Sequence, residues 1–242
     1  MPHDFIGVNG VARKIVGAYV GVNGVARKVK KAYVGVNGVA KRIYPRLPDA
    51  YQEVEYLYGN GTPYINTGLT AADIDEYAYS FKKPYAKYGA VFGNYVSEDS
   101  DVVRAIFTAS ENNGMYLYLN TKASGGSLSS TLNIDYDNFN EVSVSIDSTT
   151  ITGTTNGATK TRSIVHGNEN LTNIALFHTR CSVSASNASY IKYFIFKKNG
   201  KEVRNFVPCY RKSDNVAGMY DVANDVFYTN AGNGAFTVGS DV

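Results

Sequence analysis

The sequence predicts an all-β protein in which a short β-hairpin repeat precedes a two-sheet jelly-roll sandwich. The strand formers Val, Ile, Thr, Tyr and Phe are plentiful, whereas the helix formers Leu, Glu and Gln are sparse. From residue 51 onward, more than a dozen short segments alternate apolar and polar side chains, with Gly- and Asn-containing turns between them. So many short strands in one domain are typical of a sandwich or jelly roll.

The first 44 residues contain three near-copies of the phrase Gly-Val-Asn-Gly-Val-Ala, each followed by basic residues. The copies begin at Gly7, Gly21 and Gly35, so the period is 14 residues. Asn-Gly between strand formers is the strongest short-range hairpin signal, because both central residues of a type I′ turn need positive φ. Each copy is therefore predicted to turn at its Asn-Gly.

A turn at Asn-Gly also predicts which residues face each other. In the middle copy, Val22 should face Val25, and Gly21 should face Ala26. A two-stranded unit of this size cannot bury its valines alone, and its open edges invite pairing with another chain. We therefore expect residues 1–44 to assemble and anchor the protein as a homo-oligomer. Separate hairpins and one long meander both fit the sequence.

The residues predicted to make these assembly contacts are the repeat valines and tyrosines Val8, Val22, Val25, Val36, Val39, Tyr19 and Tyr33.

Charge is distributed unevenly along the chain. Residues 1–50 hold nine Lys/Arg against two Asp/Glu, whereas residues 51–242 hold fifteen against nineteen. A basic arm of this kind could bind nucleic acid or another phosphate-rich polymer. Aromatic residues that would stack on bases are few there. We therefore expect a solvated or partner-facing basic surface rather than a nucleic-acid site.

The segment 45–50, with Pro45 and Pro48, is predicted to be a linker, and residues 51–242 form the head. No apolar run approaches the roughly 18 residues of a membrane span. The N-terminus lacks the pattern of a secretion signal. The strands predicted in the head are 51–58, 63–68, 76–81, 88–96, 102–109, 114–120, 140–147, 149–154, 172–178, 190–198, 201–210, 217–222, 225–229 and 234–238.

Three segments carry a resemblance to a known family. The stretches "YLYGNGTPYINTGL" (56–69) and "YIKYFIFKKNGKEVRNFVPCYRKSDNVAGMYDVANDVFYTNAGNGAFTVG" (190–239) resemble the opening and closing parts of concanavalin A-like (laminin G-like) jelly rolls in phage and prophage virion proteins. The "GVNGVARK" repeats are similar to segments of virion proteins from phages of Gram-positive bacteria.

This resemblance implies a phage virion appendage on a tail, baseplate or capsid, assembled in the host cytoplasm. Residues 1–44 would mount it on other virion proteins, and a lectin-like head would bind a host cell-surface glycan. Such appendages are commonly trimeric. The alternatives are a purely structural decoration protein and a glycan depolymerase.

Hydrolases of this fold place carboxylates as Glu-x-Asp-x-x-Glu on one strand, which suits a retaining mechanism. The nearest runs here, Glu53-Val54-Glu55 and Asp73 to Glu76, do not match that spacing. We therefore expect no catalytic residues and no enzymatic activity.

The remaining reactive side chains are scattered. His3, His166 and His178 are far apart in sequence, and Cys181 and Cys209 are predicted to be reduced thiols in strands. No cluster has the spacing of a metal site, and no cofactor motif occurs. The acidic runs at Glu98, Asp99 and Asp101, and at Asp73, Asp75 and Glu76, leave a Ca²⁺ site between strands open.

A head without Trp must stack sugars on Tyr, whose ring is apolar and whose hydroxyl stays hydrated. The densest Tyr/Asn runs are 85–95 and 114–120. The residues predicted to bind carbohydrate there are Tyr85, Tyr88, Asn94, Tyr95, Tyr116, Tyr118 and Asn120.

Overall fold

The computed structural model describes residues 5–8, 11–14, 19–22, 25–28, 32–36, 39–44, 47–84, 89–94, 105–108, 114–119, 126–163, 172–178 and 188–242. The elements within these ranges are strands, apart from one short 3-10 helix. The elements are β1 (Phe5–Val8), β2 (Val11–Lys14), β3 (Tyr19–Val22), β4 (Val25–Lys28), β5 (Ala32–Val36), β6 (Val39–Tyr44), β7 (Tyr51–Glu53), β8 (Leu57–Gly59), β9 (Ile65–Asn66), η1 (Ala71–Asp73), β10 (Glu76–Lys82), β11 (Gly89–Gly93), β12 (Ala105–Thr108), β13 (Gly114–Leu119), β14 (Gly126–Asn133), β15 (Asn140–Ile146), β16 (Thr150–Thr155), β17 (Ala158–Ser163), β18 (Ala175–Leu176), β19 (Ser189–Lys198), β20 (Lys201–Arg211), β21 (Val216–Asp221), β22 (Val226–Thr229) and β23 (Thr237–Val238).

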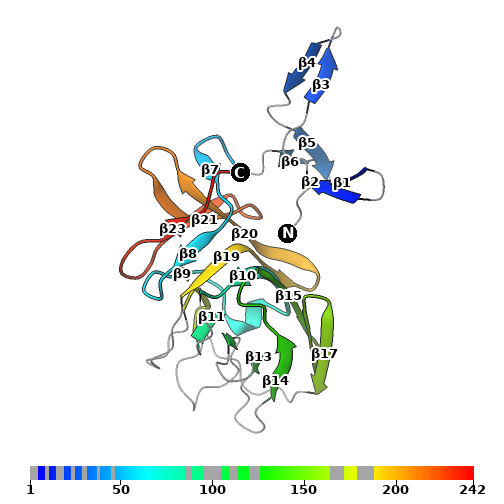
Figure 1. The fold of residues 1–242 in the computed structure, drawn as a ribbon, viewed down its shortest axis with the longest axis vertical. Coiled ribbons are helices and arrows are strands. Elements are labelled where there is room, and N and C mark those ends of the chain that lie inside the picture. Colours follow the sequence, from blue (N-terminus) through cyan, green and yellow to red (C-terminus); the bar gives the residue numbers. More distant parts are fainter. Residues whose placement is uncertain are drawn as a thin grey trace.

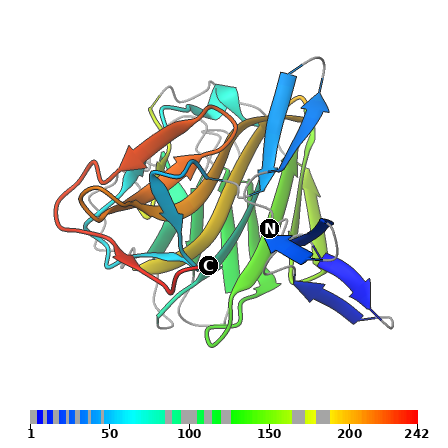
Figure 2. The same cartoon turned by 90° about the horizontal axis from the view of Figure 1, so that it is seen from above.

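The N-terminal repeat forms three separate two-stranded sheets, β1–β2, β3–β4 and β5–β6. In the middle hairpin Val22 pairs with Val25 and Gly21 pairs with Ala26, which confirms the predicted register. The structure thus selects separate hairpins over a long meander. Figures 1 and 2 show the hairpins beside the large sheet, on the side where the C-terminus also lies.

The predicted assembly residues all lie in these hairpin strands, at paired positions. Val8 pairs with Val11 in the first hairpin, and Val36 pairs with Val39 in the third. The role of these residues in assembly stays a prediction.

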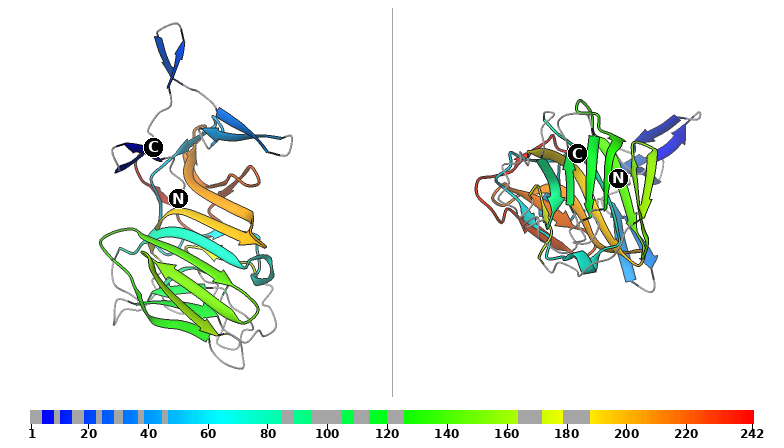
Figure 3. Two further views of the ribbon diagram at one scale, coloured as in Figure 1. Left: turned by 90° about the vertical axis from the view of Figure 1, so that its right-hand side faces the viewer. Right: turned by 90° about the horizontal axis from the view of Figure 1, so that it is seen from below.

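The head is a jelly-roll sandwich of two antiparallel sheets, seen as two layers in Figures 1 and 3. The main path of the large sheet runs β17-β16-β15-β10-β19-β20-β21-β22, with β7, β8 and β23 joined to it. The small sheet has the order β14-β13-β12-β11-β18-β9. Sequential strands pair at the edges, whereas β10 is placed between β15 and β19 by pairing across distant parts of the chain.

Aromatic side chains fill the space between the two sheets. Because side chains alternate across a strand, Tyr77 and Tyr79 of β10 point inward beside Phe194 of β19, and all three are at most 2% exposed. The rings of Tyr79 and Phe194 stack with centroids 4.6 Å apart. Phe92 from the small sheet meets Phe194 edge-on at 4.8 Å. This cluster holds the two layers together.

A second, smaller core lies on the outer face of the large sheet, the face turned away from the small sheet. Leu47, Val207, Cys209 and Tyr220 pack there, with Tyr51 against Tyr220 at 4.8 Å. Leu47 is only 3% exposed. The segment predicted as a linker therefore contributes a buried residue to the head.

Two strands of the sandwich were not predicted. β14 is rich in Gly and Ser and contains only two leucines, whereas every residue of β17 is exposed. β17 forms the edge of the large sheet, so neither of its faces needs an apolar stripe. Its sequence consequently lacks the alternation that marks a half-buried strand.

Candidate functional site

The structure places only some of the predicted sugar-binding residues. Tyr116 and Tyr118 lie in β13, paired with Phe107 and Ala105 of β12. Tyr85, Tyr88, Tyr95 and Asn120 lie outside the described residues.

The prediction that Asn94 belongs to an exposed patch around residues 85–95 is wrong. Asn94 is fully buried, and its Nδ2 donates to the carbonyl oxygen of Thr172 at 3.3 Å. Asn94 directly follows β11, whose residues Ala90, Val91 and Phe92 are all fully buried. A side chain in this position cannot contact a ligand on the surface.

The acidic run after η1 is occupied by structural contacts. Asp73 Oδ2 accepts hydrogen bonds from the backbone N and hydroxyl of Thr70 at 2.7 and 2.8 Å. The Asp75 carboxylate accepts from the backbone N of Asn199. Among the described residues, no three His, Cys, Asp or Glu side chains converge as a metal site would require. Glu98, Asp99 and Asp101 lie outside these residues.

Two of the reactive side chains considered in the sequence, Cys209 and His178, lie in the part of the chain that the structure describes. Cys209 in β20 is a free, buried thiol, and burial raises its pKa to about 12. His178 comes just after β18 rather than on a strand, with its ring 5.4 Å from that of Tyr64. His3, His166 and Cys181 fall in parts of the chain that the structure does not describe.

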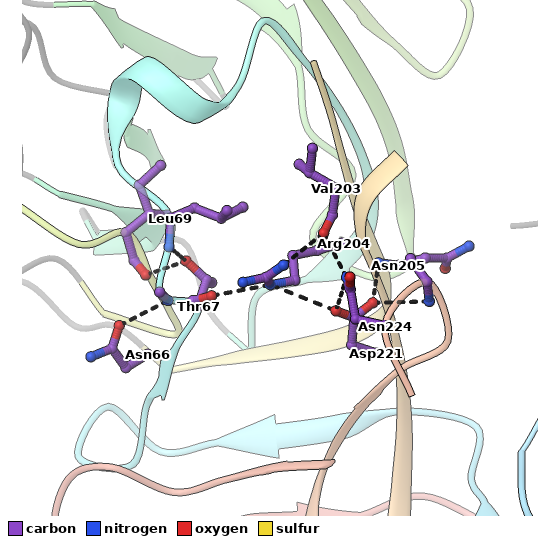
Figure 4. A network of polar contacts seen from close by, with 11 residues as sticks. Asn66, Thr67, Leu69, Val203, Arg204, Asn205, Asp221 and Asn224 are labelled. Carbon is purple, nitrogen blue, oxygen red and sulfur yellow. Dashed lines mark hydrogen bonds and ion pairs between the residues drawn. The ribbon is translucent and has the colours of Figure 1, made fainter. Parts of the chain in front are cut away.

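The closing segment that carries the family resemblance forms a polar network around one buried carboxylate (Figure 4). Asp221 ends β21 and is fully buried. Its carboxylate accepts from the backbone N of Asn205 at 2.8 Å and from Nδ2 of Asn224 at 2.8 Å, and it lies 3.6 Å from Nε of Arg204. Arg204 Nε in turn donates to the carbonyl oxygen of Thr67 at 3.2 Å.

This network connects β20, the turn after β21 and the loop after β9. Its polar atoms are directed at one another, and Asp221 is shielded from solvent. Arg204 and Asp221, which lie in the segment that carries the family resemblance, therefore hold the fold together rather than form a ligand site.

An exposed aromatic surface lies elsewhere, on the outer face of the large sheet where β8 pairs with β19. It consists of Tyr56, Tyr58, Phe139 and Tyr190, all partly exposed, and we call it the aromatic platform. Tyr58 and Tyr190 are direct cross-strand partners, and their rings stack with centroids 4.4 Å apart. Tyr56 meets Tyr190 edge-on at 5.1 Å, and Phe139 lies 6.1 Å from Tyr56.

Strand alternation explains why these rings point outward. Leu57 and Ile191 are neighbours of the platform tyrosines in β8 and β19, and both are fully buried in the core. Their neighbours Tyr56, Tyr58 and Tyr190 must therefore project from the opposite face.

Close backbone packing holds Tyr56 in place. A Cβ atom on Gly239 would come within 2.9 Å of the Tyr56 ring, so only glycine fits beside it. The backbone N of Gly239 donates to the carbonyl oxygen of Tyr56 at 2.9 Å. The C-terminal strand β23 thus supports the platform from one side.

Phe139 is positioned by the tight loop that precedes β15. The Asp135 carboxylate accepts hydrogen bonds from the backbone N of Asp137 and from Asn138, which lower its pKa. Buried Asn140 donates through Nδ2 to the carbonyl oxygen of Asp135 at 2.7 Å. These bonds fix the loop and hold Phe139 over the sheet.

Charged groups border the platform. Lys192 Nζ lies 4.1 Å from the centroid of the Phe139 ring and 3.2 Å from Oε1 of Glu55. Lys82 Nζ donates to the carbonyl oxygen of Asp137 at 2.6 Å. The platform therefore offers apolar ring faces next to a paired cation and carboxylate.

Sequence reasoning missed this surface because its parts come from residues 56–58, 139 and 190. The available signal was the alternation of Tyr56 and Tyr58 around buried Leu57, together with Tyr190 near the start of β19. Nothing in the sequence places the three segments together.

Comparison with known proteins supports the fold. No protein-family profile matches the sequence, and no curated protein does. Among solved structures, the mouse laminin alpha1 chain, domains LG4-5, is similar with a TM-score of 0.50 and 12% identity. The match covers 92% of this chain and 53% of the solved LG4-5 chain, so this chain spans about half the length of that chain. The head thus has a laminin G-like jelly-roll fold.

Two further solved structures are more distant. The CBM40 domain of Ruminococcus gnavus IT-sialidase, solved with alpha2,3 sialyllactose, has a TM-score of 0.38 and 15% identity over 60% of this chain and 91% of its own. The heptameric SAP-like pentraxin from Limulus polyphemus has a TM-score of 0.40 and 10% identity over 83% of this chain and 92% of its own. Scores this low assign neither a ligand nor an oligomeric state. Among the described elements, no helix is long and apolar enough to cross a membrane.

Proposed function

We propose that this protein is a non-enzymatic virion appendage, a tail fibre, receptor-binding or decoration protein, whose head binds carbohydrate on the host cell surface. The observation that carries the binding function is the aromatic platform of Tyr56, Tyr58, Phe139 and Tyr190.

The chemistry of the platform suits a sugar. A pyranose ring has an apolar face of C–H groups, which packs on an aromatic ring, and hydroxyls at its edge, which need polar partners. Tyr supplies both an apolar face and a hydroxyl. Lys192 and Glu55 at the border add a donor and an acceptor, and their 3.2 Å ion pair leaves little net charge. An uncharged sugar is therefore the best match.

The virion role rests on the N-terminal hairpins and on the family resemblance of residues 190–239. The hairpins β1–β2, β3–β4 and β5–β6 each pair only within themselves among the described strands. Such units gain stability by stacking on neighbours. We propose that they join copies of this chain, as a trimer, and attach it to other virion proteins.

The non-enzymatic part of the proposal rests on how the carboxylates are engaged. Glu55 pairs with Lys192 at 3.2 Å, and Glu76 pairs with Lys197 at 3.8 Å. A glycosidase needs two carboxylates that face each other across the scissile bond, whereas each of these two is held by a lysine.

The test measures binding of the full chain to an array of wall polysaccharides from Gram-positive bacteria, followed by titration against the strongest hit. Tyr190→Ala should lower the affinity roughly 10-fold, because a lost aromatic contact costs about 1.5 kcal/mol. Phe139→Ala, on a separate loop, should act in the same direction. Tyr190→Phe keeps the ring and should retain most of the affinity.

Tyr210→Ala is the matched control, because it removes a partly exposed tyrosine of β20 outside the platform. Thermal unfolding followed by circular dichroism establishes that each variant is folded. Failure to bind any polysaccharide would favour a purely structural decoration protein. Release of reducing sugar from a bound polysaccharide would favour a depolymerase instead.

A further inference from the structure

A shallow trough lies on the same outer face of the large sheet, toward the opposite end of β10. Its volume is about 230 Å³. It lies over four neighbouring strands, β10, β15, β16 and β19, and its outward side chains are Glu76, Ala78, Ser143, Ser145, Thr152, Thr154 and Lys197.

The trough exists because small side chains occupy adjacent outward positions. Ala78 pairs with Ser143, and Ser143 pairs with Thr154 on the next strand. At one end Lys197 Nζ lies 3.8 Å from Oε2 of Glu76 and forms a taller wall. The floor is consequently low and rich in hydroxyls.

Neighbouring hydroxyls on β17 orient the threonines of the trough. The hydroxyls of Thr152 and Thr161 are 3.1 Å apart, and those of Thr154 and Thr159 are 2.9 Å apart. A hydroxyl can donate one hydrogen bond and accept two, so these threonines retain capacity for a ligand. The same bonding pattern is offered by the hydroxyls of a sugar.

The trough and the platform are aligned along the same strands. Lys82, at one end of β10, pairs with the platform residue Tyr190, and Glu76, at the other end, pairs with Lys197 of the trough. Six residues separate the two ends, which is about 20 Å in an extended strand. That distance is longer than any monosaccharide.

A polar bridge occupies the face between the two sites. Tyr193 and Glu141 are the two cross-strand neighbours of Ser80, and the Tyr193 hydroxyl donates to Glu141 Oε2 at 2.5 Å. Ser80 beneath this bond is fully buried, whereas Glu141 is exposed. The Glu141 carboxylate therefore provides a further acceptor between the trough and the platform.

We infer that the ligand is a linear polysaccharide, which stacks one sugar on the aromatic platform and places another in the hydroxyl-lined trough. This inference rests on the proposed carbohydrate-binding function. The trough is smaller than the roughly 300 Å³ lower limit of typical small-molecule pockets, so it fits one unit of a longer ligand. The ion pairs at both ends favour a chain without strong charge.

The experiment compares the intact polysaccharide with its size-fractionated oligosaccharides, using the strongest hit from the array and the full chain. Affinity should rise about 10-fold once a fragment is long enough to span both sites. The double variant Ser143→Ala/Ser145→Ala removes two exposed hydroxyls from the trough without adding bulk. It should bind the polysaccharide as weakly as the parent binds short fragments, while its affinity for short fragments stays unchanged.

Ser163→Ala is the control, because it removes an exposed hydroxyl from β17 outside the trough. Equal affinity of the parent for short and long ligands would overturn the inference. Retention of the full length-dependent gain by Ser143→Ala/Ser145→Ala would do the same, even if Tyr190→Ala still lost binding. Absence of binding to every polysaccharide would instead overturn the proposed function, and the inference with it.

Discussion

Replacing Asp221 by Asn changes one buried carboxylate oxygen into an amide NH₂ and leaves the shape of the side chain unaltered. Oδ1 continues to accept from the backbone N of Asn205 and of Ala223. Oδ2 currently accepts from Nδ2 of Asn224 at 2.8 Å and faces Nε of Arg204 at 3.6 Å. After the substitution, the new amide NH₂ is itself a donor, and it faces the two donors Asn224 Nδ2 and Arg204 Nε.

The magnitude follows from those two contacts. A hydrogen bond to a charged group contributes about 1.5–3 kcal/mol, and here one such bond is lost while the Arg204 charge loses its partner. Arg204 keeps 20% of its side chain exposed, so water partly compensates for that charge. We expect the free energy of unfolding to fall by about 2–3 kcal/mol, which lowers Tm by roughly 4–12 °C at this chain length.

Thermal unfolding is followed by far-UV circular dichroism, because the chain contains no Trp. Asp225→Asn is the matched control: it makes the same charge change in the same turn, at an exposed residue with φ of 56°, which Asn tolerates. If Asp221→Asn and Asp225→Asn unfold at the same temperature, the network of Arg204 and Asp221 does not hold the fold as argued.

Three further results are expected. Gly218→Ala should destabilise the head by about 1–3 kcal/mol, because the new Cβ would lie 2.2 Å from the Tyr228 carbonyl oxygen; an unchanged Tm would refute this. Cys209, whose pKa burial raises to about 12, should resist iodoacetamide at pH 8 in the folded protein and react in denaturant, as peptide mass spectrometry would show; fast native alkylation would contradict its burial. The hydroxyl and backbone of Thr150, with the backbone of Thr149, lower the pKa of Asp147 from 3.8 to about 2. The ionised Asp147 carboxylate should stabilise the fold fully above about pH 4, and this stabilisation should be lost as the pH falls through 2. The Tm of Asp147→Asn should therefore change less between about pH 2 and pH 4 than the Tm of the parent. Parallel Tm profiles of the two proteins would contradict this prediction.

Parts of the fold that depend on neighbours in sequence could be predicted well. The hairpin register of the repeat follows from Asn-Gly, because positive φ at two adjacent residues is a local requirement. In the same way, β15 was predicted from its alternation, and its residues do alternate between buried and exposed. Both features need only a few consecutive residues.

Surfaces formed by strands that are distant in the sequence could not be predicted. Tyr58 and Tyr190, which are 132 positions apart in the sequence, meet because β8 pairs with β19. Asn94 was predicted to lie in an exposed Tyr/Asn patch, but it is buried, and the carbonyl oxygen of Thr172 accepts its hydrogen bond. Leu47 was assigned to a linker, although the outer face of β20 and β21 covers it.

The sequence by itself thus determined the all-β class, the three hairpins and most of the strands, since backbone dihedral preferences and side-chain alternation act over a few residues. The tertiary structure alone decided which face of each strand stays exposed and which tyrosines become neighbours. The reason is physical: burial depends on the layer that packs against a strand, and in this sandwich the neighbouring strands and the opposite sheet come from remote parts of the chain.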